Sequence, residues 1–215
     1  MSLDRTEKLA LFIRKVLGLS EDTWLDCLDV LRRLKAINVI FDFRPGTMAE
    51  LGGAAAKWIQ KTKTILIAPD LWDELEGSVN PEIRFTVFHE VGHAVMNHSD
   101  RNRNFGGAYQ AGRFVESDED EADRFAMALA MPMTIVNTTN VSDKKSLIRQ
   151  FGLPEDKTEL RMVDLQMQIR HPSEKVEAAI AEIDLFDAEY WLKTNAFKNK
   201  HLDRSVPTQD EDWDF

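Results

Sequence analysis

The stretch from Arg84 to His98 constrains this chain most, because it carries His89, Glu90 and His93 in the spacing His-Glu-x-x-His. On an α-helix, residues four apart project from the same face, so both imidazoles can reach a single ion. Glu90 follows the first histidine, which places its carboxylate beside a water on the ion, where a general base is needed. The spacing therefore predicts a metal-binding helix with His89 and His93 as ligands and Glu90 as the catalytic residue.

A third protein ligand is expected, because catalytic zinc sites usually take three and leave the fourth position to water. One class of zinc protease takes it from a histidine six residues after the second. Ser99 occupies that position here. His98 is one residue short, and on a continuous helix it would point to a different side from His93. The third ligand must therefore come from further along the chain.

Residues 117–131 are predicted to form a second helix, with Ser117 as its N-cap, acidic residues in its first turn and Pro132 as its terminator. One face of this helix carries a stripe at i, i+3, i+4 and i+7 that is rich in small residues, namely Glu119, Ala122, Asp123 and Ala126. Such a stripe allows the second helix to pack closely against the first.

This periodicity selects the remaining site residues. Glu119 is predicted to bind the metal, and Asp123, one turn later, to accept the outer N–H of a ligating histidine. Glu121 is the alternative ligand and ranks second, because it lies roughly 160° around the helix from the centre of the stripe.

The pairing of the Arg84–His93 segment with the Glu119–Pro132 segment resembles the ImmA/IrrE metallopeptidases, a bacterial and phage-associated family with a thermolysin-like zinc site. The resemblance extends over residues 37–170 and is densest from Arg84 to Pro132. It implies zinc bound by two histidines and the downstream glutamate, with Glu90 as catalytic residue. It also implies a protein substrate, a helix-turn-helix transcriptional repressor whose cleavage switches on stress-response or mobile-element genes.

Composition sets the broad class. The chain has 215 residues, of which 43% are hydrophobic and 30% charged, as expected for a globular protein of one or two domains. A single cysteine, Cys27, excludes an internal disulfide, and no export signal or membrane-spanning run is evident, so we expect a cytoplasmic protein without membrane contact. The net charge of −10 argues against direct binding of nucleic acid.

The expected fold is α+β and zincin-like. N-terminal helices precede strand-like segments at 37–43, 51–59 and 62–68, which predict a small, mostly antiparallel sheet. We expect this sheet to pack on the helix with the His-Glu-x-x-His motif and on the second ligand-bearing helix, followed by C-terminal helices. Asn80 and Pro81 are a fitting cap and first turn for the metal-binding helix.

Three regions are predicted. Residues 1–134 would form the metallopeptidase domain with its N-terminal helices. Residues 135–200 would form a C-terminal helical region whose helix–turn–helix outline suits docking of a substrate or partner better than DNA binding. Residues 201–215 are an acidic tail, expected to be disordered.

The glycine-containing connection at residues 100–116 links the two predicted ligand helices and is well placed to border a substrate cleft. As a hypothesis, Tyr109, or one of Arg101, Arg103 and Arg113, contacts substrate or stabilises the oxyanion.

Two alternatives to a specific zinc endopeptidase stay open. One is a metal-stabilised regulator that binds a protein partner without cutting it. The other is a general peptidase activated by stress. The metal is also open, since the same His and carboxylate ligands accept manganese or cobalt in place of zinc.

Overall fold

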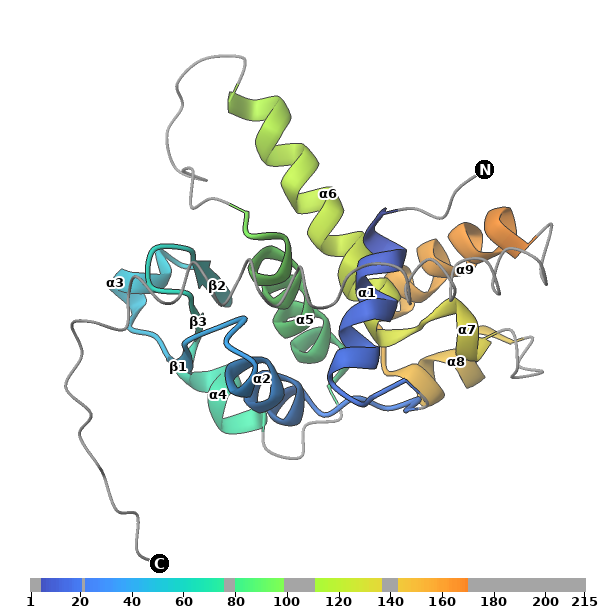
Figure 1. The fold of residues 1–215 in the computed structure, drawn as a ribbon, viewed down its shortest axis with the longest axis horizontal. Coiled ribbons are helices and arrows are strands. Elements are labelled where there is room, and N and C mark those ends of the chain that lie inside the picture. Colours follow the sequence, from blue (N-terminus) through green and yellow to red (C-terminus); the bar gives the residue numbers. More distant parts are fainter. Residues whose placement is uncertain (1–4, 21, 76–79, 99–110, 137–142, 170–215) are drawn as a thin grey trace, which may run out of the picture.

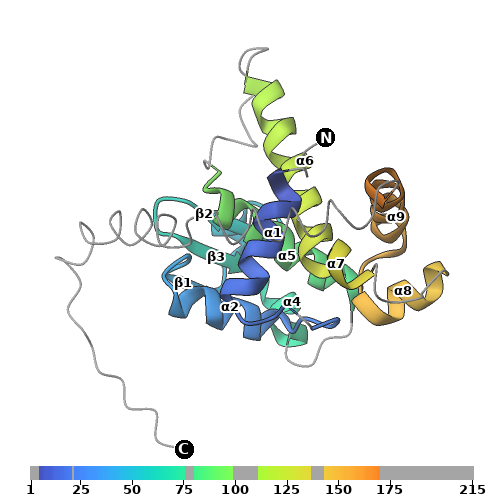
Figure 2. The ribbon, with the colours of Figure 1, turned by 45° about the vertical axis from the view of Figure 1, so that its right-hand side comes forward.

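Helices α5 (Pro81–Met96) and α6 (Ala111–Ala130) pack against each other, and the other elements are arranged around them (Figure 1). The computed structural model describes residues 5–20, 22–75, 80–98, 111–136 and 143–169. The small sheet lies on one side of α5, and helices α7 (Met133–Val136), α8 (Lys144–Phe151) and α9 (Glu155–Ile169) lie on the other (Figures 1 and 2). The predicted α+β class is confirmed.

Helix α5 begins as the sequence predicts. The Asn80 side chain accepts a hydrogen bond from the Glu82 N–H at 3.0 Å, and Pro81 occupies the first turn, where its missing N–H costs nothing. The helix ends at Met96 because Asn97 adopts the left-handed conformation, with φ 56° and ψ 40°. The chain therefore turns away from the helix axis directly after Asn97.

Helix α6 begins at Ala111 rather than at Ser117, so the expectation that Ser117 is an N-cap is wrong. A capping preference is a local signal, and the helical hydrogen bonding continued upstream overrides it. The helix ends at Ala130, two residues before Pro132, close to the predicted end. The last six residues of the supposed connection at 100–116, residues 111–116, therefore belong to α6.

The small-residue stripe lets α5 and α6 approach closely. Ala122 and Ala126 are fully buried, and a Cβ added at Gly92 of α5 would lie only 3.1 Å from the Ala122 Cα. This contact therefore has room for no side chain larger than glycine at position 92 of α5 and alanine at position 122 of α6. The close approach brings the side chains of α6 within reach of the histidines on α5.

The sheet has strand order β1-β3-β2, with β1 at Asp42–Pro45, β2 at Ala56–Ile59 and β3 at Thr64–Ile67. Strands β2 and β3 pair antiparallel, whereas β1 and β3 pair parallel. The sheet is therefore mixed, where the sequence predicted mostly antiparallel pairing. The chain places α3 (Met48–Leu51) and β2 between β1 and β3, which supplies the crossover that parallel pairing requires.

Two buried hydrogen bonds tie the N-terminal helix α1 (Arg5–Val16) and α9 (Glu155–Ile169) to the C-terminal end of α6. Arg14 donates to the Leu129 carbonyl at 2.7 Å, and Arg161 donates to the Met131 carbonyl at 3.0 Å. These bonds satisfy carbonyls that the end of a helix leaves without an intrahelical partner. Arg161 also forms a buried ion pair with Glu7 at 2.6 Å.

Gly152, with φ 62°, forms the turn between helices α8 and α9, as a helix–turn–helix outline requires. The larger of two clusters of buried apolar side chains in the described ranges extends from α1 to α9. The division of the chain at residues 134 and 135 stays a prediction, and the acidic tail at 201–215 lies outside the described residues. The elements between α1 and α9 not bounded above are α2 (Cys27–Ala36) and α4 (Pro69–Leu75).

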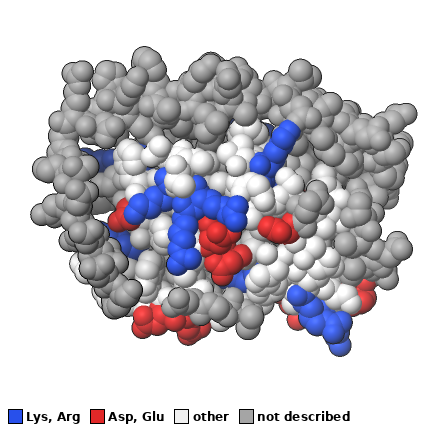
Figure 3. All heavy atoms as spheres, turned by 60° about the horizontal axis from the view of Figure 1, so that its bottom comes forward, with Lys and Arg blue, Asp and Glu red and all other residues white. Residues whose placement is uncertain are grey.

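Figure 3 shows the molecule with the lower side of Figure 1 turned forward. On this face, basic and acidic side chains lie beside one another. Among the surface ion pairs, Arg33 meets Asp29 at 2.8 Å within α2, and Lys35 of α2 meets Asp42 of β1 at 2.9 Å. These cations are therefore neutralised locally. None of the helices in the described ranges combines the length and apolar character needed to cross a bilayer.

Candidate metal centre

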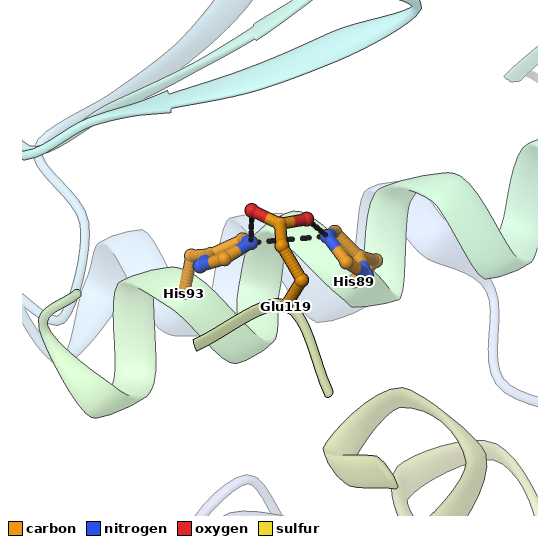
Figure 4. Close-up of side chains that lie close together, drawn as sticks. All are labelled: His89, His93 and Glu119. Carbon is orange, nitrogen blue, oxygen red and sulfur yellow. Dashed lines mark hydrogen bonds and ion pairs between the residues drawn. The ribbon is translucent and has the colours of Figure 1, made fainter. Parts of the chain in front are cut away.

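The side chains of His89, His93 and Glu119 converge on one point between α5 and α6 (Figure 4). The two Nε2 atoms of His89 and His93 lie 3.0 Å apart. Glu119 spans them, with Oε2 at 3.1 Å from His89 Nε2 and Oε1 at 3.5 Å from His93 Nε2. The three residues that the sequence predicts as ligands are thus brought together by packing of the two helices.

The spacing of these atoms suits a small divalent ion. Zinc bonds of about 2.0–2.2 Å to nitrogen and oxygen in a tetrahedron place neighbouring ligand atoms about 3.3 Å apart. The observed separations of 3.0, 3.1 and 3.5 Å lie close to that value. Two imidazoles and one carboxylate are also the donor set of a common class of catalytic zinc site, which keeps one position open. The residues therefore fit a catalytic metal ion.

The outer nitrogen of His89 meets Asp123. Nδ1 lies 2.7 Å from Asp123 Oδ1, and because an ionised carboxylate only accepts, Nδ1–H is the donor and Nε2 is left to face the ligand cluster. Asp123 is held in turn by Lys157 of α9, whose Nζ donates to Oδ2 at 2.7 Å. The predicted position of Asp123 beside a histidine is observed, whereas Lys157 was not predicted.

The outer nitrogen of His93 meets His98, with the two Nδ1 atoms 2.9 Å apart. The sequence argument placed His98 on another side of the helix, but α5 ends at Met96, so a helical projection does not apply to His98. Asn97, in the left-handed conformation, instead turns the chain back toward the last turn of α5. The His98 N–H donates to the His93 carbonyl at 3.0 Å. Asparagine tolerates this conformation better than most residues, which is the only signal in the sequence that could have indicated the turn.

Glu121, the alternative ligand, lies beside His98 and not with the three converging ligand atoms. Its Oε2 is 3.5 Å from His98 Nε2, and Asp118 Oδ1 is 3.9 Å from the same nitrogen. Both acids project from α6, so His98 is positioned between His93 and two carboxylates. Only 9% of its side chain is exposed.

Glu90 is 3% exposed and points toward the sheet. Its Oε2 accepts the backbone N–H of Trp58 at 2.6 Å. Trp58 lies on β2, which pairs with β3 along its other side. This short hydrogen bond fixes the Glu90 carboxylate against the outer edge of the sheet, one residue along the helix from His89.

The charges around His89 and Asp123 favour a protonated imidazole facing an anion in the absence of metal. Burial lowers the pKa of His89, but the hydrogen bonds to Asp123 and Glu119 and the nearby Glu90 outweigh it and raise the pKa to about 9. Burial likewise raises the pKa of Asp123, and the hydrogen bonds from His89 and Lys157 outweigh it, so that pKa is lowered. The pKa of His98 is lowered, mainly by burial and also by the neighbouring His93. A metal ion must therefore displace a proton from His89.

The predicted substrate contacts in the connection between the helices are not placed. Tyr109, Arg101 and Arg103 lie outside the described residues. Arg113 falls in the first turn of α6, and its side chain is not among those described. These four residues stay hypotheses.

Comparison with known families gives one match. Residues 78–162 match the Peptidase_M78 family model, described as an IrrE N-terminal-like domain. The matched segment contains His89, His93, Glu90, Glu119 and Asp123, and it extends into α9. No curated protein and no solved structure matches the chain.

Proposed function

We propose that this chain, whose residues 78–162 match the metallopeptidase domain of the Peptidase_M78 family, is a zinc-dependent endopeptidase that cuts a regulatory protein. The observation that carries the proposal is the convergence of His89, His93 and Glu119 on one point, with Glu90 adjacent on the same helix. The family is the one suggested by the resemblance in the sequence.

A divalent ion held by the three side chains would supply Lewis acidity toward a water molecule and toward the scissile carbonyl. Glu90 is the general base in this proposal: it accepts the proton of the attacking water and passes it to the leaving amine. Its hydrogen bond from Trp58 keeps the carboxylate oriented. Burial at 3% exposure excludes bulk water that would otherwise solvate the carboxylate.

The edge strand β2 is a suitable place for the substrate. Among the described residues β3 pairs with one side of β2, and an extended peptide can add along the part of the other side that Glu90 does not occupy. The Trp58 N–H on that strand reaches Glu90, so a peptide lying along β2 would pass the general base. We therefore propose that substrate binds in an extended conformation beside β2.

The proposed substrate is a helix-turn-helix repressor, as the family resemblance implies. DNA-binding proteins of this type carry basic surfaces, and a protein with a net charge of −10 attracts them electrostatically. Cleavage would separate the DNA-binding part of the repressor from its oligomerising part and derepress stress or mobile-element genes. Such a substrate implies activity in the cytoplasm. Helices α8 and α9 are the proposed docking region.

Zinc is the proposed metal because the donor set of two imidazoles and a carboxylate matches a catalytic zinc site. Manganese and cobalt accept the same ligands, so metal analysis of the purified protein decides between them. One equivalent of zinc per chain is expected, and removal by a chelator should abolish cleavage.

The replacement Glu90→Gln tests the proposal. Glutamine keeps an oxygen that accepts the Trp58 N–H but cannot take a proton, so cleavage should fall about 10²–10⁴-fold while zinc content is unchanged. Glu82→Gln, an exposed position in the first turn of the same helix, is the matched control. The assay incubates each protein with the repressor encoded beside it and reads the products by mass spectrometry.

The same assay separates the alternatives. Full cleavage by Glu90→Gln, or by metal-depleted protein, would refute the mechanism. Zinc binding and repressor binding without any cleavage by the native chain would favour a non-proteolytic regulator. Cleavage of many unrelated unfolded proteins would favour a general peptidase.

A further inference from the structure

His98 occupies a position that neither the motif nor the helical periodicity assigns to the site. Its Nδ1 lies 2.9 Å from Nδ1 of His93, and its ring meets the His93 ring edge-on at a centroid distance of 5.0 Å. Its other nitrogen faces Glu121 at 3.5 Å and Asp118 at 3.9 Å. A residue between the His93 imidazole and two carboxylates is well placed to orient that imidazole by hydrogen bonding.

The hydrogen-bonding roles follow from the chemistry of the rings. His93 turns Nε2 toward His89 and Glu119, and a neutral imidazole that offers Nε2 to a metal carries its proton on Nδ1. Two ring nitrogens at 2.9 Å need one donor and one acceptor, so His98 must present a bare Nδ1 and carry its own proton on Nε2. That Nε2–H then points toward the carboxylates of α6, which can only accept.

We infer that His98 is the positioning residue of His93: it fixes the tautomer and ring orientation of this ligand, with Glu121 and Asp118 fixing His98 in turn. This inference rests on the proposed metal site. Both proposed ligand histidines then have a hydrogen-bonding partner at Nδ1, because Asp123 holds that nitrogen of His89 and His98 holds that of His93. It also gives Glu121 a role other than that of a ligand.

The fold explains why such a partner comes from just beyond the helix. Asn97 ends α5 in the left-handed conformation, and the His98 N–H returns to the His93 carbonyl at 3.0 Å. The side chain is thereby held beside His93 by the backbone, with 9% of its surface exposed. Little conformational entropy is left to lose when metal binds, so the ligand is preorganised.

The test measures zinc affinity of the full-length protein by chelator competition, with Co²⁺ absorption spectra as a second readout of ligand geometry. His98→Leu removes the acceptor and should weaken zinc binding 10–100-fold, the usual effect of losing a partner of this kind. His98→Gln offers a carbonyl oxygen to His93 and an amide N–H to the acids, and should restore affinity to within a few-fold of native. The Co²⁺ spectrum should change in the Leu variant and not in the Gln variant.

Gln60→Leu is the matched control, because Gln60 donates to the Asn97 carbonyl at 3.0 Å and its replacement perturbs the same turn while His98 is kept. Zinc affinity should stay native in this variant. Native affinity and spectrum in His98→Leu, or equal losses in His98→Leu and His98→Gln, would overturn the inference. Failure of the native protein to bind zinc would instead overturn the proposed function.

A measurement on the unaltered protein covers the case in which the variants do not fold. Nitrogen-15 spectra of the zinc-loaded chain report which ring nitrogen of each histidine carries a proton. A protonated Nδ1 on His93 with a bare Nδ1 on His98 is expected. A proton on His98 Nδ1 would overturn the inference.

Discussion

Loss of the Glu7 carboxylate should destabilise the whole protein, although Glu7 lies outside the segment that matches the family. Its side chain is 2% exposed and that of Arg161 is 3% exposed, and the two groups lie 2.6 Å apart. In Glu7→Ala, Arg161 stays buried without its counter-ion, which typically costs about 3–5 kcal/mol. The Met133 N–H, which donates to Glu7 at 3.3 Å, loses its acceptor as well. The expected loss of about 4 kcal/mol is a large part of a typical total of about 5–15 kcal/mol.

Urea unfolding of metal-free protein measures this loss as a lower midpoint at unchanged slope. The double variant Glu7→Leu/Arg161→Met removes both charges, and should be more stable than Glu7→Ala because no charge is left uncompensated. Lys35→Ala breaks the exposed Lys35–Asp42 pair, which is 2.9 Å long, and should change stability little. A loss below about 1 kcal/mol in Glu7→Ala, or a double variant less stable than the single one, would refute the reasoning.

Four further predictions concern the site. Zinc binding at pH 7 should release about one proton from His89, whose pKa is about 9 without metal, as measured by calorimetry in buffers of different ionisation enthalpy; no release would contradict the charge assignment. In metal-free protein, the hydrogen bonds that raise the pKa of His89 add to the free energy of unfolding. This stabilisation should be complete below about pH 6.5 and should be lost as the pH rises through 9. Asp123→Asn should weaken zinc binding 10–100-fold with little loss of helicity, and native affinity would show that Asp123 does not orient His89. Gly92→Ala should cost about 1–3 kcal/mol and lower zinc affinity, because the added Cβ would lie 3.1 Å from the Ala122 Cα and push Glu119 away; unchanged thermal unfolding would contradict the close packing.

The buried polar contacts explain how elements outside the ligand helices support the site. Glu119 projects from α6, and the far end of α6 is held by Arg14 of α1 and Arg161 of α9. Lys157 of α9 additionally holds Asp123. The N-terminal helix and the C-terminal helices thus restrain the same ligand-bearing helix from both sides.

Features that depend on neighbours along one helix could be read from the sequence. The spacing of His89 and His93, the cap at Asn80, and the placement of Glu119 and Asp123 on one face all follow from the period of an α-helix. Strand-like segments were identified for the same reason, since alternation is also a local property. Local periodicity does not encode the direction in which strands pair, so the parallel pairing of β1 and β3 was not predicted.

The remaining parts of the site depend on how the chain turns and which distant segments meet. His98 reaches His93 only because Asn97 leaves the helix, and a projection that assumes a continuous helix places it wrongly. Lys157 lies far from Asp123 in the sequence and meets it only because α9 packs against α6. The sequence alone thus identified the three candidate metal ligands, because the period of each helix places its candidates on one face. Only the tertiary structure decided which side chains hold those residues in place, because long-range packing has no local period.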